Sequence, residues 1–521
     1  MDSVYLSIIK SDYGREITKT RKFQKIRKLF DLRKKNEYTL DDQTWNDFDM
    51  DKVFEKLDRT YSSAGEASLY SMLRNPLSDE NDLKMRGDLV QTLMDDSNLR
   101  EKISLISYEL HWDKKSSFID MIENDLIINK PKFYIYTLLG KILPIVFLIC
   151  TFINIQFIVA LLSLGFVNVI INNTERKNVK SNGIMYLRKI INASKSIRKI
   201  KNPAIDYHKK TIDTILNQIK AIDSGTSFIS FANIWGGFFE VLALLFLLEE
   251  SSYYAISDKI NNQKDLLMDL YYTIGELDAL ASMASFKQTM AGDYSKPKFI
   301  KDIQLNITGG IHPILKKPVP NSISINNHGI VLTGTNMSGK STFLRMLGIN
   351  ILLAQTFYFV LAKSYEAPFF NIVSSISPSD DVTQGKSYFM AEVESLFRVI
   401  KATEKPLPVF CAIDEIFRGT NPIERIAMSA EILTYLNNGT TLSIVSTHDR
   451  ELTKILKDDF DFYYFSEDVD SKTGLSFDYK LKKGISQTKN AIKLLEYMNY
   501  PKIITEKAFK RAEKIDEYSK N

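Results

Sequence analysis

The sequence predicts an all-helical first part, interrupted by an apolar hairpin, and an α/β second part. Three observations support this prediction. Apolar residues recur at helical spacing through most of residues 37–297, a pattern typical of amphipathic helices. Two apolar runs, 133–153 and 155–171, stand close together within this part. From Phe299 onward, strand-like apolar runs alternate with helical stretches, as expected for a sheet covered by helices on both faces.

Composition indicates several folded domains. The chain has 521 residues, of which 44% are apolar and 25% are charged, and these values exclude a largely disordered protein. A net charge of +5 gives only a weak bias toward anionic partners. The two cysteines, Cys150 and Cys411, form neither a disulfide framework nor a metal site, which fits a reducing compartment.

Residues 1–36 are predicted to form a basic amphipathic N-terminal helix. Lys and Arg are frequent between Arg15 and Lys35, and apolar residues are interleaved with them at roughly helical spacing. Such a face can contact nucleic acid or anionic lipid, and a solvated helix surface is the alternative. Residues 37–130 are then expected to form the first part of a helical core without catalytic groups.

The two apolar runs predict a transmembrane helical hairpin over residues 131–173, with 133–171 in the bilayer. About a dozen large apolar residues per run favour insertion by roughly 4 to 7 kcal/mol, against at most ~3 kcal/mol for Lys141. Basic residues flank both ends of the hairpin, and the turn is uncharged. The positive-inside rule therefore places both flanks, and the domains attached to them, on the cytoplasmic side. A buried hairpin inside a soluble fold is the alternative.

A third apolar run, residues 228–248, lies in the second part of the helical core, 174–297. Polar residues within this run, including Ser230, Asn233 and Glu240, fall on one stripe at helical spacing. A full crossing here would also leave the C-terminal half on the side opposite the hairpin flanks. We therefore expect a core or membrane-surface helix, with a third span as the alternative.

Residues 330–342 fit the phosphate-binding pattern G-x-x-x-x-G-K-[ST], with a strand-like run before it and a helical stretch after it. Gly334 and Gly339 allow backbone N–H groups to face phosphates. Lys340 is expected to reach the β and γ phosphates of ATP, and Ser341 to bind Mg²⁺. The predicted nucleotide-binding residues of this loop are Gly334, Thr335, Asn336, Met337, Ser338, Gly339, Lys340, Ser341 and Thr342.

Two later strand ends carry further candidate groups. The apolar run Val409–Ile413 ends in Asp414 and Glu415, which are suited to hold Mg²⁺ and to deprotonate an attacking water. A run at 442–445 leads to His448, which could sense or stabilise a γ phosphate, although a structural role is commoner for such a histidine. The predicted activity is therefore ATP hydrolysis. Its candidate catalytic residues are Glu415, Lys340 and His448, and its candidate metal ligands are Ser341 and Asp414.

The order of these motifs resembles that of the MutS mismatch-repair ATPases. The motifs that carry the resemblance are Thr333–Thr342, Gly385–Glu392, Asp414–Asn421 and Ser446–His448, with Gly310–Leu315 upstream and Glu276–Ala284 in the helical part. The resemblance implies an ABC-type P-loop ATPase domain over 298–500, followed by a C-terminal helix, 501–521. It also implies a homodimer in which Ser387 of one subunit approaches the γ phosphate held by the other. Asn421 would carry signals between the two sites.

Departures from the family pattern refine this expectation. We expect no mismatch-reading domain before Asp41, and the apolar hairpin stands where the family inserts its DNA clamp. Thr335 replaces a usual Pro, and Phe417 and Asn490-Ala491 replace usual Gly positions. The likeness is thus to shorter, membrane-associated MutS-like ATPases. The expected function is a membrane-anchored ATPase acting on mismatched or branched DNA, and the alternative is a mechanical or signalling ATPase acting on a protein or lipid partner.

Overall fold

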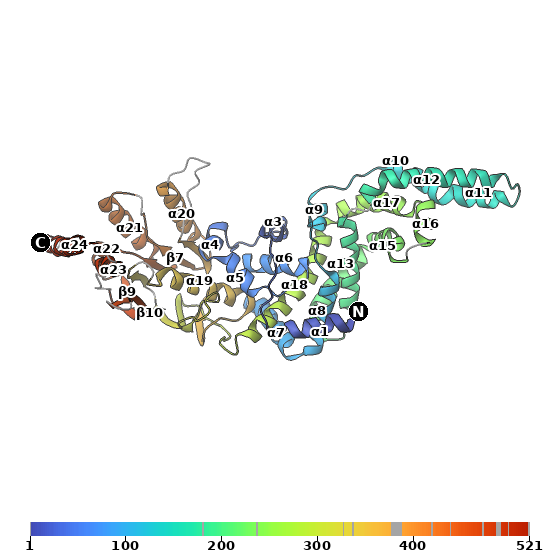
Figure 1. Ribbon diagram of the computed structural model, residues 1–521. Coiled ribbons are helices and arrows are strands. Elements are labelled where there is room, and N and C mark those ends of the chain that lie inside the picture. The colour runs from blue at the N-terminus through green and yellow to red at the C-terminus, as the bar shows by residue number, and fades with distance from the viewer. Residues whose placement is uncertain are drawn as a thin grey trace. The chain divides into compact units, whose positions relative to one another are not determined.

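The computed structural model describes residues 2–179, 182–235, 238–326, 328–335, 338–376, 388–417, 420–437, 439–470, 474–485, 491–498 and 500–518. The chain divides into two compact units. The first contains Met1–Lys35, Leu57–Met72 and Asp88–Thr289, and the second contains Asn36–Lys56, Leu73–Gly87 and Met290–Asn521. The first unit is helical and the second holds the strands (Figure 1), which confirms the predicted combination of an α part with an α/β part.

The first unit is organised around one long, largely buried helix, α18 (Lys264–Thr289). Its other elements are α1 (Asp2–Asp12), α2 (Phe23–Ile26), α3 (Lys28–Leu32), α8 (Ser97–Leu110), α9 (Ser117–Glu123), α10 (Lys130–Thr137), η1 (Leu138–Ile142), α11 (Leu143–Thr151), α12 (Phe157–Val179), α13 (Asn182–Arg198), η2 (Pro203–Ile205), α14 (Asp206–Gln218), α15 (Lys220–Trp235), α16 (Phe238–Leu245) and α17 (Leu248–Asn262). Helices α5 (Met50–Leu57), α6 (Ser63–Arg74) and α7 (Glu80–Asp95) contribute residues to both units.

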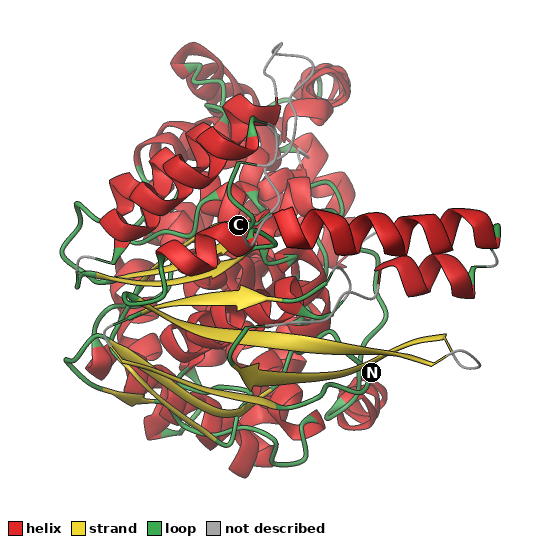
Figure 2. Ribbon diagram, turned by 90° about the vertical axis from the view of Figure 1, so that its left-hand side faces the viewer, coloured by secondary structure: helices red, strands yellow, loops and turns green. Residues whose placement is uncertain are grey.

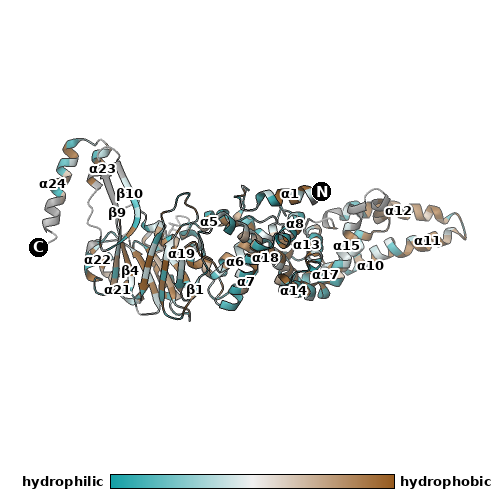
Figure 3. Ribbon diagram, turned by 90° about the horizontal axis from the view of Figure 1, so that it is seen from below, coloured by the Kyte–Doolittle hydropathy of each residue, from teal (hydrophilic) through white to brown (hydrophobic). Residues whose placement is uncertain are grey.

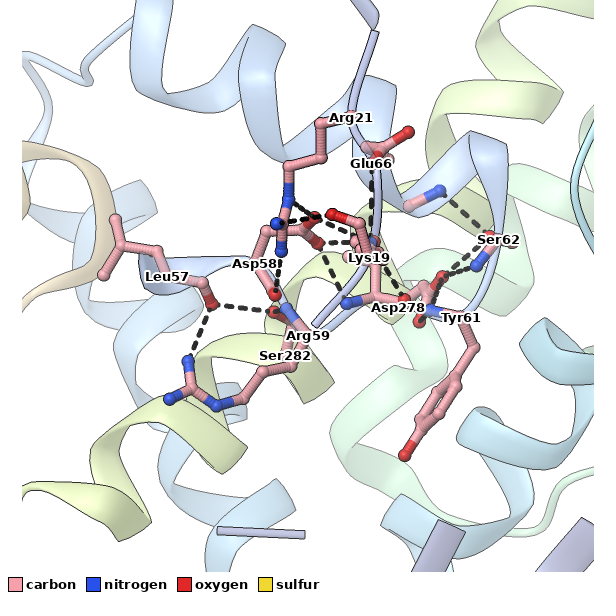
Figure 4. Close-up of polar contacts among 12 residues, drawn as sticks. Lys19, Arg21, Leu57, Asp58, Arg59, Tyr61, Ser62, Glu66, Asp278 and Ser282 are labelled. Carbon is pink, nitrogen blue, oxygen red and sulfur yellow. Dashed lines mark hydrogen bonds and ion pairs between the residues drawn. The ribbon is translucent and has the colours of Figure 1, made fainter. Parts of the chain in front are cut away.

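The basic N-terminal stretch forms three separate helices and not the single helix predicted for residues 1–36. Between α1 and α2 the chain is non-helical, and it brings two cations to one buried carboxylate (Figure 4). Lys19 Nζ lies 2.6 Å and Arg21 Nε 2.8 Å from Asp58 Oδ2. A continuous helix would point residues two apart to different faces, so this pairing requires the extended backbone. Part of the basic charge of this stretch is therefore paired with a carboxylate inside the first unit.

The apolar runs form a helical hairpin, with α10, η1 and α11 in one arm and α12 in the other. Among the described residues, two helices are long and apolar enough to cross a membrane, Lys130–Thr151 and Phe157–Glu175. Only 17% and 11% of the residues in their most apolar windows are buried. Figure 3 shows the apolar character of α11 and α12. This exposure does not fit the alternative of a buried core hairpin.

The described residues of the third apolar run lie mainly in α15 and α16, and the helix ends before residue 248. α16 ends at Leu245, and Leu247 has a positive φ of 43°, so the chain turns before α17 begins. Residues 236 and 237 lie outside the described residues.

The second unit contains two sheets (Figure 2). The larger has the strand order β10-β9-β4-β8-β7-β6, and the smaller has the order β1-β5-β2-β3. The strands are β1 (Lys298–Phe299), β2 (Gln304–Gly310), β3 (Asn321–Asn326), β4 (Gly329–Thr333), β5 (Ser364–Ala367), β6 (Asn371–Ser375), β7 (Val409–Asp414), β8 (Thr441–Ser446), β9 (Phe460–Asp470) and β10 (Gly474–Lys483). Strands β4, β8 and β7 are parallel and buried, so their carboxyl ends meet at one edge of the sheet.

The second unit also contains helices before, between and after the strands of the larger sheet. They are α4 (Asp42–Asp47), α19 (Lys340–Phe357), α20 (Tyr388–Ala402), α21 (Pro422–Leu436), α22 (Arg450–Ile455), α23 (Ala491–Tyr497) and α24 (Lys502–Tyr518). Helix α4, which was expected to belong to the helical core, covers the outer edge of β6. The buried Asp47 Oδ2 accepts hydrogen bonds from Ser374 Oγ at 2.7 Å and from the backbone N–H of Ile376 at 2.9 Å. This edge strand is thereby closed to further pairing.

Candidate functional site

The loop between β4 and α19 has two glycines in left-handed backbone among its described residues. Gly334 and Gly339 have φ values of +141° and +111°, which favour glycine. A Cβ atom at Gly334 would lie 2.8 Å from the carbonyl oxygen of Phe465 and 3.0 Å from Ser338 Oγ. The loop therefore requires glycine at this position for both conformation and space. Asn336 and Met337, which were predicted to bind nucleotide, lie outside the described residues.

Lys340 lies at the first position of α19 and is almost completely buried. Its Nζ donates to the carbonyl oxygens of Gly334 at 2.8 Å and Thr335 at 3.0 Å, so the ammonium group is held against the loop. Ser338 Oγ is also buried and makes no hydrogen bond to any described residue. A buried hydroxyl without a partner beside a buried cation is chemically suited to an anionic oxygen.

Ser341 and Asp414 form a pair of oxygen donors at the carboxyl edge of the sheet. Ser341 Oγ donates to Asp414 Oδ2 at 2.5 Å. Asp414 ends β7, where it is paired in register with Ser446 of β8, and the Ser446 hydroxyl donates to its other carboxylate oxygen. A hydroxyl and a carboxylate are hard ligands of the kind that Mg²⁺ prefers. The structure thus brings together the two residues that were predicted to bind metal.

Glu415 and His448 follow neighbouring strands, and their side chains meet. His448 Nε2 lies 3.1 Å from Glu415 Oε1 and 3.3 Å from Lys340 Nζ. Glu415 has a φ of +58°, an uncommon conformation for a residue other than glycine, and its N–H donates to the carbonyl oxygen of Ser446 at 3.1 Å. Strained backbone of this kind is frequent at functional sites. The three predicted catalytic residues are therefore adjacent.

Lys340, Ser341, Asp414 and Glu415 line a cavity of about 700 Å³, a size typical of small-molecule sites. Thr342 also lines this cavity. Another part of the cavity wall was not predicted from the sequence. It contains His312, Leu315, Lys317, Val319, Asn321, Phe465 and Tyr479. Burial, together with the nearby Arg345 guanidinium, lowers the pKa of His312 to about 4, so this imidazole is neutral at physiological pH. The motif Gly310–Leu315 was the only sequence signal near this wall.

The remaining predicted residues lie elsewhere or are not described. Asn421 is exposed and caps α21, where its side chain accepts a hydrogen bond from the N–H of Ile423 at 3.0 Å. Ser387 lies outside the described residues. Phe417, which stands where the family usually has Gly, has a φ of +58° and is buried. Its backbone therefore adopts a conformation that a glycine would reach at lower cost, and the buried ring packs against Phe389.

Comparison with known proteins finds a family match in this part of the chain. The family model MutS domain V matches residues 330–516, a range that contains the loop, both carboxylates and His448. This part of the chain matches the MutS family. It is 30% identical over 271 residues to the DNA mismatch repair protein MutS of Thermus thermophilus, covering 51% of this chain and 32% of the relative. The MutS proteins of Halalkalibacterium halodurans and Thermotoga maritima are 28% identical, over 50% and 51% of this chain and 31% and 34% of their own lengths. The match to MutS thus spans about a third of each curated relative.

Proposed function

We propose that this MutS-family protein is an ATP hydrolase that is anchored in a membrane and acts on DNA. The observation that carries the proposal is that Lys340, Ser341, Asp414 and Glu415 line a single cavity. His448 lies next to it, in contact with Glu415 and Lys340. These side chains come from the phosphate loop and from two separate strand ends. A structural strand-to-helix turn would not require this convergence.

The residues present fit ATP with Mg²⁺. The left-handed glycines open the loop, and the buried Ser338 hydroxyl lacks a described partner, as expected beside a phosphate. Ser341 and Asp414 would hold the metal, and Lys340 would contact the phosphate oxygens. When bound, Mg²⁺ supplies neutralisation of the charge that develops on the transferred phosphoryl group.

The chain's own residues provide the proton chemistry. Glu415 would accept a proton from the attacking water. His448 Nε2 can either donate to Glu415 Oε1 or accept from Lys340 Nζ, because one nitrogen cannot do both in the same protonation state. Donation to Glu415 would hold the carboxylate in one orientation, and acceptance from Lys340 would release it. We infer that His448 positions Glu415 in this way.

We propose that the protein forms a homodimer, because its motifs resemble those of the family. Ser387 of one subunit would complete the site of the other, and Asn421 would connect the two sites. For the membrane anchor, the proposal rests on the hairpin, whose large apolar residues are exposed along both arms, including Ile142, Ile149 and Leu162. Its flanks are basic and its turn is uncharged, which supports a cytoplasmic side for the catalytic part.

DNA, in mismatched or branched form, is proposed as the partner because the relatives are named DNA mismatch repair proteins. The alternative is a mechanical or signalling ATPase that acts on a protein or lipid. Two observations favour that alternative. The chain carries an apolar hairpin, and Lys19 and Arg21 of its basic N-terminal stretch are paired with Asp58 and so are not available to phosphates.

The deciding experiment measures ATP hydrolysis by the full chain in lipid nanodiscs, with and without homoduplex, mismatched and branched DNA. The proposal expects DNA to change the hydrolysis rate and to bind with an affinity that falls as salt rises. Hydrolysis that ignores every DNA, together with no salt-dependent binding, would remove DNA as the partner and leave the alternative. The absence of any hydrolysis in nanodiscs or detergent would contradict the ATPase itself.

A further inference from the structure

We propose that the described residues 228–235 and 238–247 of the third apolar run form a re-entrant membrane element, which enters the cytoplasmic leaflet beside the hairpin and turns back without crossing. This inference rests on the proposed membrane anchor, and it names lipid as the occupant of the apolar surface of α15 and α16. The contacts that carry it all lie within the first unit, among the two arms of the hairpin, α15, α16 and α17.

A polar layer at the base of the hairpin marks the membrane boundary. Lys132 Nζ of one arm lies 2.6 Å from Glu175 Oε1 of the other. The hydroxyls of Tyr136 and Tyr254 donate to the Glu175 carboxylate at 2.9 and 2.8 Å. From this layer to the hairpin turn at 152–156 there are about 20 residues, or ~30 Å of helix, which equals one hydrocarbon thickness. Lys132 and Glu175 therefore lie at the cytoplasmic boundary.

The C-terminal end of α16 lies well above this layer. Asn168, about two helical turns or ~10 Å beyond Glu175 along α12, donates from Nδ2 to the carbonyl oxygen of Leu245 at 2.6 Å and of Leu139 at 3.2 Å. A Cβ atom at Gly165, about one further turn along, would lie 3.1 Å from Leu245 Cδ2. Since Leu245 ends α16, the turn between α16 and α17 lies at the depth of the hydrocarbon.

The turn between α16 and α17 is enclosed by other parts of the protein, as non-helical backbone inside a membrane must be. Carbonyl groups freed at a helix end have no water to bind in lipid, so they must find partners in the protein. Asn168, itself fully buried, provides such a partner for Leu245. At Gly140 the opposite arm approaches so closely that a Cβ atom would lie 2.2 Å from the carbonyl oxygen of Phe246. Small residues at close helix contacts are typical of membrane proteins.

The chain then returns to the side from which it came. Asn172 Nδ2 donates to Glu250 Oε1 at 2.6 Å near the start of α17, and Tyr254 meets Glu175 one turn later. Ile256 packs against α15, where a Cβ atom at Gly225 would lie 2.3 Å from Ile256 Cγ2. The start of α15 and the middle of α17 thus lie side by side at the level of the boundary. A spanning helix would place them on opposite faces.

Apolar side chains point outward from the re-entrant element. Phe228 of α15 and Val241 of α16 are 53% and 54% exposed. Ile135 and Ile170 of the hairpin are each 50% exposed. The element and the hairpin therefore expose the same kind of large apolar side chains, and one lipid environment would cover both.

Cysteine accessibility tests the inference. In a Cys150→Ser background, the full chain would carry Val241→Cys, Ile145→Cys as a hairpin reporter, or Ile423→Cys as an aqueous control, because Ile423 is 79% exposed. The remaining Cys411 is fully buried. In lipid nanodiscs, we expect a charged maleimide to label Val241→Cys and Ile145→Cys at least about tenfold more slowly than Ile423→Cys, until detergent is added. Bimane at position 241 should be quenched by nitroxide on lipid acyl chains.

A second arm distinguishes re-entry from crossing. Lys220→Cys, at the start of α15, and Asn262→Cys, at the end of α17, lie before and after the element. Both should be labelled in sealed vesicles in which Ile423→Cys is accessible. Labelling of only one of them would mean a third span and would overturn the inference. Rapid labelling of Val241→Cys while Ile145→Cys stays protected would also overturn the re-entrant element, but it would leave the proposed hairpin anchor intact. Rapid labelling of Ile145→Cys would instead reject the anchor, and the inference with it.

The role of Asn168 gives an independent readout. Asn168→Ala should leave the hairpin reporter protected but increase labelling at Val241→Cys severalfold, because the Leu245 carbonyl oxygen loses its partner. Asn154→Ala, at the hairpin turn, is the matched control and should change neither rate. Equal labelling rates of Val241→Cys in the Asn168→Ala and Asn154→Ala variants would contradict the proposed role of Asn168 in holding the end of α16.

Discussion

The Nε2 atom of His448 lies 3.1 Å from the carboxylate oxygen Oε1 of Glu415, although the two residues follow different strands. The same nitrogen lies 3.3 Å from Lys340 Nζ. One imidazole therefore joins the candidate base to the candidate phosphate-binding cation. This relationship makes the consequences of substitution at each of the three positions distinct.

Glu415→Gln should keep ATP binding and lose hydrolysis. The amide preserves shape but cannot accept the proton, and loss of a general base typically lowers kcat about 10²- to 10⁴-fold. Single-turnover hydrolysis and equilibrium binding of a fluorescent ATP analogue measure the two effects. Glu424→Gln, in the exposed first turn of α21, is the control and should behave as wild type. Normal turnover in the Glu415 variant would exclude its role as base.

Lys340→Ala should weaken nucleotide binding itself. The buried ammonium group is held by two loop carbonyls and is the cation placed to meet phosphate oxygens. Its loss removes a charge-assisted contact. Equilibrium titration with ATP and with ADP should show a large rise in Kd for both nucleotides, and unchanged affinity would contradict the assignment of this loop.

His448→Ala should lower kcat with little change in KM for ATP, because the imidazole orients Glu415 and is not expected to contribute to ground-state binding. A loss of about 10- to 100-fold is expected for a positioning residue of this kind. His448→Gln, which keeps a donor near Glu415, should recover part of the rate. Loss of ATP affinity without loss of kcat would assign His448 to phosphate binding.

Asp47→Ala should destabilise the second unit. The substitution leaves Ser374 Oγ and the N–H of Ile376 without their buried acceptor, which costs about 2 to 4 kcal/mol. Thermal unfolding of the full chain in detergent should show a lower Tm. Asp302→Ala, at an exposed position, should change stability by no more than about 0.5 kcal/mol. Equal Tm values for the two variants would mean that the contact of α4 with β6 adds little.

Stability of the first unit should depend on pH through Glu66. Burial raises the pKa of this carboxyl to about 7, and the nearby Lys19 ammonium only partly opposes the shift. Burial also raises the pKa of Asp278 to about 6. The folded state then binds protons more tightly than the unfolded state, so stability falls as pH rises from about 4.5 through about 7.

Glu66→Gln tests this dependence, because the amide cannot ionise. The Tm of the variant relative to wild type should be higher at pH 8 than at pH 5. Arg21 and Asp58 also face Glu66 within the cluster in Figure 4, and the substitution leaves them in place. A difference in Tm that does not vary with pH would show that Glu66 is not the titrating group.

The sequence was most informative where a function depends on neighbouring residues. The loop Gly334–Thr342 could be predicted because its glycines, lysine and hydroxyls are contiguous and their backbone requirements are local. The hairpin could be predicted as a pair of helices because their apolar runs are long. The basic stretch before Asp41 was predicted as one helix, since spacing alone did not reveal that Lys19 and Arg21 both pair with Asp58.

By itself, the sequence determined the glycine-containing loop before α19, the pair of carboxylates at the end of β7, the apolar hairpin and the order of helical and α/β parts, because each is encoded in one continuous stretch. The tertiary structure decided that His448 contacts Glu415, that α4 closes the edge of β6 and that Asn168 binds the end of α16. These contacts join residues far apart in the chain. Their geometry follows from strand order and helix packing, which local pattern and composition do not encode.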